Sequence, residues 1–185
     1  RYFFFFLKLV NMDLERLRYP VGKFERQMIY SPEYVTDCIE KIKTCPQRLE
    51  ALISGWPSEK FEYTYRPGGW NGREIVHHML DSHLNALIRL KLALTEEAPI
   101  IKPYLQDEWV KLSDYQLDPL MVIPILHGIH TKLALLFTSM DESDYSRELR
   151  HPEHPGIHLD LLWLLGLYSW HSDHHLGHLS IIDSQ

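Results

Sequence analysis

Cysteine is scarce in this sequence, which holds only Cys38 and Cys45 among its 185 residues. The two lie in a segment with helical periodicity, and their spacing puts their Cα atoms about 10 Å apart. A disulfide needs Cα atoms within about 7 Å of each other, so we do not expect this pair to cross-link. Two free thiols fit a reducing compartment, and we expect the protein to be cytoplasmic.

Long apolar runs and clustered positive charge are also missing. After the first eleven residues, no stretch approaches eighteen uninterrupted apolar residues, so we expect no membrane-spanning helix. The net charge of -6 is spread along the chain, whereas nucleic-acid-binding proteins usually carry a clustered basic face. The composition therefore argues against a membrane or a nucleic acid as partner, and we expect a small-molecule substrate.

Several catalytic motifs are absent as well. The sequence has no His-Glu-x-x-His motif of zinc proteases, no phosphate-binding loop and no Gly-x-Ser-x-Gly nucleophile elbow. Glu74 and His77 match half of a di-iron Glu-x-x-His signature, but the predicted last helix supplies no second half. A metalloprotease, a nucleotide-binding protein of the phosphate-loop type and a di-iron protein are therefore not favoured.

The N-terminal segment differs from the rest of the chain. Residues 1–7 resemble the start of a signal peptide, but Lys8 interrupts the apolar run and no small-residue cleavage site follows. We interpret residues 1–11 as a mis-assigned start or a vector remnant. We accordingly treat residues 1–18 as an atypical segment and residues 19–185 as a single domain.

Helical periodicity and start signals predict an all-α protein with four helices. The predicted helices span Ser31–Ser54, Asn71–Leu94, Asp118–Ser139 and Leu159–Ile182. Ser31 precedes a proline at the first helical position, and Asn71 is followed by Glu74 as a capping-box partner. Pro46 predicts a kink or a break in the first helix, because proline lacks the backbone N–H that the helix interior needs.

The connection between the second and third helices is long enough to affect the topology. About 23 residues can span the length of a helix, which allows these two helices to run parallel through a crossover. We therefore expect a four-helix bundle with a long crossover between its second and third helices.

Histidine is the abundant residue, with 12 copies, none of them before position 77. Seven fall in two short stretches, 77–83 and 171–178, on the second and fourth predicted helices. A lone helical histidine is usually a satisfied polar residue. Seven on two helices of one bundle favour a metal site over a purely structural or pH-responsive cluster.

The fourth helix presents two of its histidines inwards. At about 100° per residue, His171 and His175 fall inside the apolar arc centred on Tyr168. They are also one turn apart on the same face, which is the spacing that two imidazoles need to share one ion. His178 lies at the edge of the arc, and His174 is predicted to point out of the bundle.

The periodicity of the second predicted helix does not single out one histidine as a metal ligand. His83 lies in the middle of its apolar arc, whereas His78 lies on a polar ridge at the flank. This ridge comprises His78, Ser82, Asn85 and Arg89. A polar ridge on an apolar helix indicates a wet cavity, so its last three residues are candidates to hold or orient a substrate. Periodicity alone leaves His78 and His83 level as ligands, and it predicts His77 at the surface.

Several stretches in combination resemble the YfiT family within the DinB-like superfamily. These stretches are Arg18–Gly22, Pro67–Trp70, Arg73–His83, Arg89–Glu97, Lys102–Tyr104 and Gly166–His175. The resemblance covers nearly the whole chain after Arg18–Gly22. It implies a four-helix bundle that binds a metal through His78, His171 and His175. Asp173 stands where the family pattern leads us to expect another histidine, and we expect it to face away from the metal.

The same resemblance implies a homodimer with metal-dependent hydrolase activity. Some members are similar to thiol S-transferases that use bacillithiol. The aromatic-rich connections that hold Trp56, Tyr63, Tyr65 and Trp109 are further candidates for a dimer contact, unless these side chains merely cover the bundle ends.

Three protein ligands leave an open coordination position, whereas structural zinc sites are normally closed by four. The first hypothesis is hydrolysis by a nucleophile activated on a divalent metal, zinc by default and nickel next. The second is transfer of a low-molecular-weight thiol, which the metal would bind as its thiolate. The third is a metal-binding bundle without enzymatic activity. The residues do not distinguish the first two.

Overall fold

The computed structural model of the protein describes residues 14–153 and 159–185, so the interpretation of residues 1–11 lies outside the described residues. The four long helices are α2 (Pro32–Ile53), α3 (Gly72–Thr95), α5 (Val122–Ser139) and α7 (Leu161–Asp183). The short helices are η1 (Ser58–Glu62), α4 (Gln106–Trp109), η2 (Ser113–Gln116), η3 (Pro119–Met121) and α6 (Glu142–Tyr145). Two strands, β1 (Glu148–Leu149) and β2 (Leu159–Asp160), pair antiparallel. The predicted four-helix bundle is confirmed.

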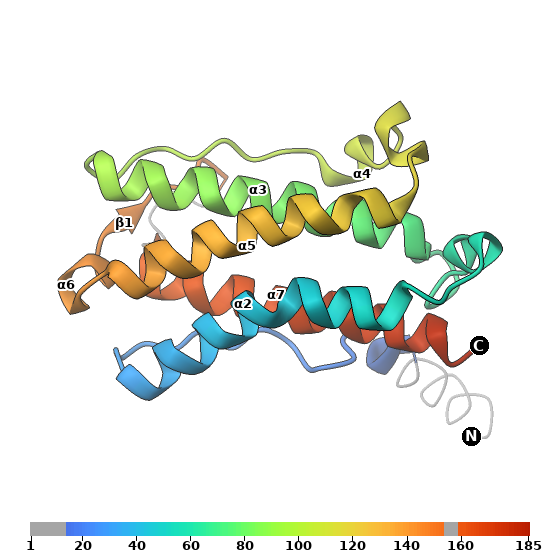
Figure 1. Cartoon of the computed structure of the whole chain (residues 1–185). Coiled ribbons are helices and arrows are strands. Elements are labelled where there is room, and N and C mark those ends of the chain that lie inside the picture. The colour runs from blue at the N-terminus through green and yellow to red at the C-terminus, as the bar shows by residue number, and fades with distance from the viewer. Residues whose placement is uncertain (1–13, 154–158) are drawn as a thin grey trace, which may run out of the picture.

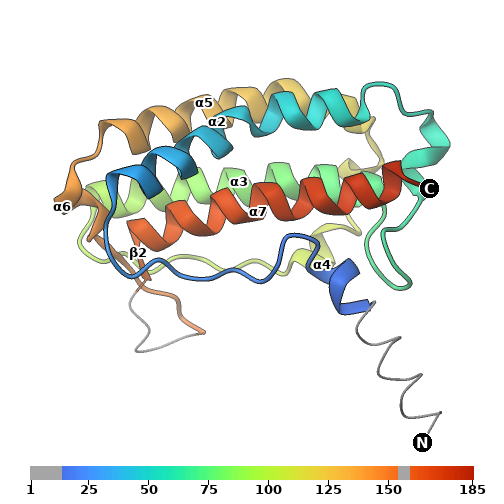
Figure 2. The ribbon, with the colours of Figure 1, turned by 90° about the horizontal axis from the view of Figure 1, so that it is seen from below.

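The bundle has a crossover topology. Helix α2 packs against α5 and α7, and α3 packs against the same two helices. Helices α3 and α5 run in one direction, and α2 and α7 run in the opposite direction (Figures 1 and 2). The connection from α3 returns along the length of α3 before α5 begins (Figure 1). The predicted crossover is therefore confirmed, and it leaves α3 and α7 as antiparallel neighbours.

The helices begin where the sequence signals place them, within a few residues. The Ser31 hydroxyl accepts the backbone N–H of Tyr34, and Asn71 forms a complete capping box with Glu74. The third helix opens as η3, one residue after Asp118, and continues as α5. The fourth begins slightly later than predicted, because β2 occupies the two residues before it.

Helix α2 continues through Pro46 and bends rather than breaks (Figure 1). Because proline has no backbone N–H, the carbonyl of Ile42 loses its helical donor. The Nδ1 of His130 on α5 lies 2.5 Å from this carbonyl oxygen and donates to it. A buried carbonyl oxygen without a donor is costly, so this histidine compensates for the proline.

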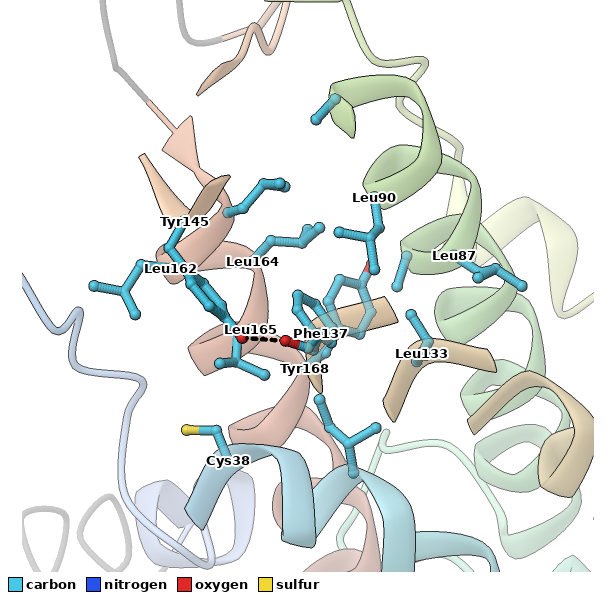
Figure 3. Close-up of a cluster of buried hydrophobic side chains, with 14 of the residues drawn as sticks. Cys38, Leu87, Leu90, Leu133, Phe137, Tyr145, Leu162, Leu164, Leu165 and Tyr168 are labelled. Atoms are coloured by element: carbon cyan, nitrogen blue, oxygen red, sulfur yellow. Dashed lines mark hydrogen bonds between the residues drawn. The ribbon is translucent and has the colours of Figure 1, made fainter. Parts of the chain in front are cut away.

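The core consists of two apolar clusters separated by a polar layer. One cluster surrounds Phe137 and Tyr168 (Figure 3), where the Tyr145 hydroxyl donates to the Phe137 carbonyl at 2.6 Å. The other lies towards the opposite end of the bundle and includes Leu49, Met79, Leu126 and Leu179. Along the helices, the residues between the two clusters include His83, Ser172 and His175, all buried. The buried His130 of α5 stacks on His83. The histidines therefore form a layer at the middle of the bundle.

Within the described residues, the segment Pro119–Ser139 alone is long and apolar enough to cross a membrane by length and composition. It comprises η3 and α5, and α5 packs against α2 and α3. The core helix of a bundle meets the same criterion when its apolar side is buried by its neighbours.

The link between Pro46 and His130 is testable by a double-mutant cycle. The substitution His130→Leu should lower the free energy of unfolding by about 1–3 kcal/mol, because it leaves the Ile42 carbonyl without a donor. The substitution Pro46→Ala restores a backbone N–H that can bond this carbonyl. In the Pro46→Ala background, His130→Leu should therefore cost less, as measured by urea unfolding of metal-free protein. An equal cost in both backgrounds would contradict the pairing.

Candidate metal centre

Three histidines from two antiparallel helices converge at the polar layer. His78 lies on α3. His171 and His175 lie one turn apart on α7, the neighbouring helix in Figure 2. The Nε2 of His171 lies 3.2 Å from the Nε2 of His78 and 3.1 Å from that of His175. Two nitrogens bound to one tetrahedral zinc ion at about 2.0–2.1 Å lie about 3.3 Å apart. The geometry therefore suits one ion held by all three rings, which we call the histidine triad.

The triad is neutral at pH 7. Burial lowers the pKa of His78 to about 4. Burial, together with the other histidines of the cluster, holds the pKa of His171 and of His175 well below the ordinary histidine value. A neutral imidazole keeps a lone pair that a cation can take, whereas a protonated one has none. The site is thus prepared to bind a metal without first losing protons.

Two further histidines contact the triad from its outer side. His83 is fully buried, and its Nε2 lies 3.0 Å from Nδ1 of His171, the ring nitrogen that faces away from the triad. The Nδ1 of His178 lies 3.4 Å from Nδ1 of His175. The inward direction predicted for His171 and His175 is confirmed. On α3, His78 rather than His83 joins them in the triad.

His77 and His174 are both buried, although they were predicted to lie at the surface and to point out of the bundle, respectively. His174 is only 8% exposed, because the indole of Trp170 stacks on it and Tyr19 lies beside it. His77, predicted at the surface, is 5% exposed, and its Nε2 lies 3.2 Å from the carbonyl oxygen of Leu117. Periodicity tells in which direction a side chain leaves its own helix. It does not tell that the N-terminal segment and the long connection cover those faces.

A cavity of about 480 Å³ opens over the triad. Besides the three histidines, its lining includes Arg18, Tyr19, Tyr65, Arg66, Trp70 and Asp107. Gly68 has a φ of +66°, in the left-handed region that favours glycine. A Cβ on Gly69 would lie 2.8 Å from the Tyr65 ring. The two glycines therefore allow this turn to approach the aromatic wall of the cavity.

The sequence candidates for holding a substrate do not line this cavity. Arg89 donates to the Tyr168 hydroxyl and to the Lys102 carbonyl, both at 3.3 Å. Asn85 donates to the carbonyl of Asp81 on its own helix, and Ser82 is hydrogen-bonded to the hydroxyls of Tyr104 and Tyr168. Arg89 and Ser82 join α3 to α7 and to the long connection, whereas Asn85 is bonded within α3, so the contacts of all three are structural.

Sequence reasoning missed the arginines and tyrosines of the cavity wall. Tyr65 and Arg66 come from a turn without helical periodicity, and Arg18 ends a short helical stretch, 14–18, that the sequence analysis did not predict, so no direction was available for these side chains. The available signal was the glycine pair before Trp70, because adjacent glycines indicate a close approach of the backbone to another group.

Asp173 and the cysteines lie as expected. Asp173 faces away from the triad and forms an ion pair with Arg48 of α2 at 2.7 Å. Cys38 and Cys45 are both free and buried. Burial raises the pKa of the Cys45 thiol to about 12, so this side chain stays protonated and is a poor metal ligand.

The comparisons with known proteins point to one family. Residues 41–179 match the model of the DinB superfamily. A protein of Oceanobacillus iheyensis named "Putative metal-dependent hydrolase" is 36% identical over 163 residues, which are 88% of this chain and 94% of that protein. A protein of Bacillus cereus with the same name is 36% identical over 164 residues, covering 89% of this chain and 94% of the relative.

A solved structure agrees with these relatives. YfiT from Bacillus subtilis, described as "a probable metal-dependent hydrolase with an unusual four-helix bundle topology", superposes with a TM-score of 0.87 at 33% identity. The match covers 91% of this chain and 97% of YfiT. Sequence, fold and family model agree over most of the chain: this protein belongs to the DinB superfamily and is a YfiT-like member of it.

Proposed function

We propose that this protein is a metal-dependent hydrolase whose divalent ion is held by His78, His171 and His175. One observation carries the proposal: three neutral imidazole rings line the same cavity with their ligand atoms close together. The names of the relatives from Oceanobacillus iheyensis and Bacillus cereus support a metal-dependent hydrolase.

The donor set suits a catalytic ion. Imidazole ligands suit zinc, nickel, copper and iron, of which we take zinc as the first choice and nickel as the next. Three protein ligands leave a fourth position open. All three histidines line the cavity, so an ion held by them would be within reach of a molecule that enters it. A bound zinc ion would supply acidity, because it lowers the pKa of a coordinated water to about 7. The chain therefore needs no serine or cysteine nucleophile of its own.

The cavity wall supports a small anionic substrate. A volume of about 480 Å³ is within the range of small-molecule sites. The guanidinium of Arg18 lies 5.6 Å from the centre of the Tyr19 ring, and that of Arg66 lies 5.2 Å from the Tyr65 ring. Both arginines line the cavity, so they can bind a carboxylate or phosphate of the substrate while the tyrosines and Trp70 contact its apolar part.

Thiol transfer would use the same open position, with a thiol in place of water, and it is the alternative outcome of the activity test below. A cytoplasmic homodimer stays a prediction. Of the aromatic residues that suggested it, Trp56 and Tyr65 are buried within their own chain, whereas Tyr63 is exposed. Trp109 is half-buried, so Trp56 and Tyr65 alone fit the alternative in which the aromatics cover the bundle ends.

The first prediction of the proposal concerns metal content. Purified protein should hold close to one divalent ion per chain, and His78→Ala, His171→Ala or His175→Ala should abolish it, because each removes one of three donors. The double variant Cys38→Ala, Cys45→Ala should keep the ion, since both thiols lie outside the triad. Elemental analysis measures this directly. Equal metal content in wild type and all three histidine variants would refute the site.

The second prediction concerns the cavity arginines. Zinc-loaded protein should hydrolyse esters or amides that carry a carboxylate faster than their neutral analogues. The substitution Arg66→Gln should raise KM for the anionic substrate more than it lowers kcat, because it removes a binding charge. Arg89→Gln is the matched control, and it should leave KM unchanged because Arg89 lies outside the cavity lining.

The same assay decides between hydrolysis and thiol transfer. A panel of small thiols with an electrophilic acceptor is run beside the esters and amides, on metal-loaded and metal-free protein. Thiol conjugation without any hydrolysis would replace the proposed activity by thiol transfer. Equal activity in metal-free protein would show that the nucleophile is not activated by a metal.

A further inference from the structure

We infer that His83 and His178 are positioning residues that orient two of the metal ligands. Each would accept the N–H on the outer ring nitrogen of a ligand histidine, and so fix which nitrogen of that ligand carries its lone pair. The inference rests on the proposed metal site, and it adds two residues that do not touch the ion.

A backbone carbonyl fixes which ring nitrogens carry a hydrogen in the pair of His178 and His175. The Nε2 of His178 lies 3.1 Å from the carbonyl oxygen of Arg18, which can only accept, so this Nε2 carries the hydrogen. In a neutral ring the Nδ1 of His178 is then bare, and it accepts from the Nδ1–H of His175 at 3.4 Å. His175 is consequently left with a bare Nε2, which is the atom that faces the triad.

Stacking holds the ring of His178 in this orientation. The Tyr65 ring lies parallel to it, with centroids 3.8 Å apart and planes 24° from each other. The main-chain carbonyl of Arg18 thus fixes which nitrogen of His178 carries the hydrogen, and Tyr65 of the cavity wall fixes the orientation of the His178 ring.

The pair of His83 and His171 lies on the other side of the triad. Its protons follow from the proposed metal rather than from a backbone carbonyl, because Nδ1 of His83 has no hydrogen-bond partner among the described residues. A metal on Nε2 of His171 requires that nitrogen to be bare, so Nδ1 carries the hydrogen and donates to Nε2 of His83 at 3.0 Å. His83 stacks on His130, with centroids 4.6 Å apart and planes 16° from each other. His130 is fixed in turn by its bond to the Ile42 carbonyl, the one that Pro46 leaves without a helical donor.

A second metal ion is the competing explanation for this cluster. His174, His175 and His178 also bring ligand atoms within 4.8 Å of one another. An ion there would need a lone pair on Nδ1 of His175 in addition to the one on Nε2, and a neutral imidazole has only one. It would also compete with the hydrogen bond between His175 and His178. The contacts therefore favour one ion with outer hydrogen bonds over two ions.

Metal affinity tests the inference. Loss of an outer hydrogen bond to a ligand typically weakens metal binding about 10–100-fold. His83→Leu and His178→Leu should weaken zinc binding by such a factor, as measured by competition with a chromophoric chelator. His83→Gln and His178→Gln should recover most of the affinity, because the amide oxygen can accept the same N–H. His77→Leu is the matched control, a buried histidine of α3 that contacts the Leu117 carbonyl instead of a ligand, and its zinc affinity should be unchanged.

The outcomes separate the inference from the proposed function. A wild-type protein that binds no zinc would overturn both. A wild type that binds one ion, beside leucine variants of unchanged affinity, would overturn the inference alone. Two ions per wild-type chain would also overturn it, in favour of the second metal site.

A measurement on the wild type avoids any failure of variants to fold. In the zinc-loaded protein with ¹⁵N-labelled histidine, NMR should show a hydrogen on Nδ1 of His171 and of His175. It should also show scalar coupling from Nδ1 of His171 across the hydrogen bond to Nε2 of His83. A bare Nδ1 on either ligand would contradict the assignment.

Discussion

A neutral imidazole buried in a helical bundle has one N–H that needs an acceptor and one lone pair that needs a donor or a cation. This requirement recurs across the polar layer that separates the two apolar clusters. The backbone supplies part of the answer where it departs from regular helix: at the carbonyl that Pro46 leaves unpaired, at Arg18 in the N-terminal segment, and at Leu117 in the long connection. A divalent ion would meet the need of the triad lone pairs. Among the described residues, Nδ1 of His78, Nδ1 of His83 and Nε2 of His130 are buried without a hydrogen-bond partner.

The crossover topology decides where this layer opens to solvent. Because α3 and α5 run parallel, the connection between them must return along the bundle, and it covers the face of α3 that carries His77. Helix α7 is left as the antiparallel neighbour of α3, which brings His78 beside His171 and His175. The cavity lies over these three residues, and its wall comes from the N-terminal segment, the turn before α3, α4 of the long connection and α7 itself. Fold and site are thus linked through the long connections as much as through the helices.

Much of this arrangement could be predicted from the sequence. Capping residues and periodicity located the four helices, and the i, i+4 spacing of His171 and His175 on an apolar arc placed both side chains inside the bundle. Periodicity could not choose between His83 in the apolar arc and His78 on the polar ridge at its flank. In the structure His78 joins the triad, and His83 contacts His171 from the outer side.

What could not be predicted depends on segments without periodicity. The burial of His77 and His174 follows from chain that folds over them, far away in sequence or outside any helix. The ridge that carries Arg89 was polar for a different reason than expected: its hydrogen bonds join α3 to α7 and to the long connection. A polar helix face indicates polar partners, and the sequence does not say whether these are protein groups or a substrate.

The coordination sphere of the bound ion tests the central claim most directly. X-ray absorption spectroscopy of the zinc-loaded protein should show a four-coordinate ion. Three of its ligands should be imidazole nitrogens at about 2.0–2.1 Å, and the fourth should be an oxygen atom of a solvent molecule. A sulfur ligand at about 2.3 Å would place the ion on a cysteine. That result, or a closed shell of four imidazoles, would contradict an open site built from His78, His171 and His175.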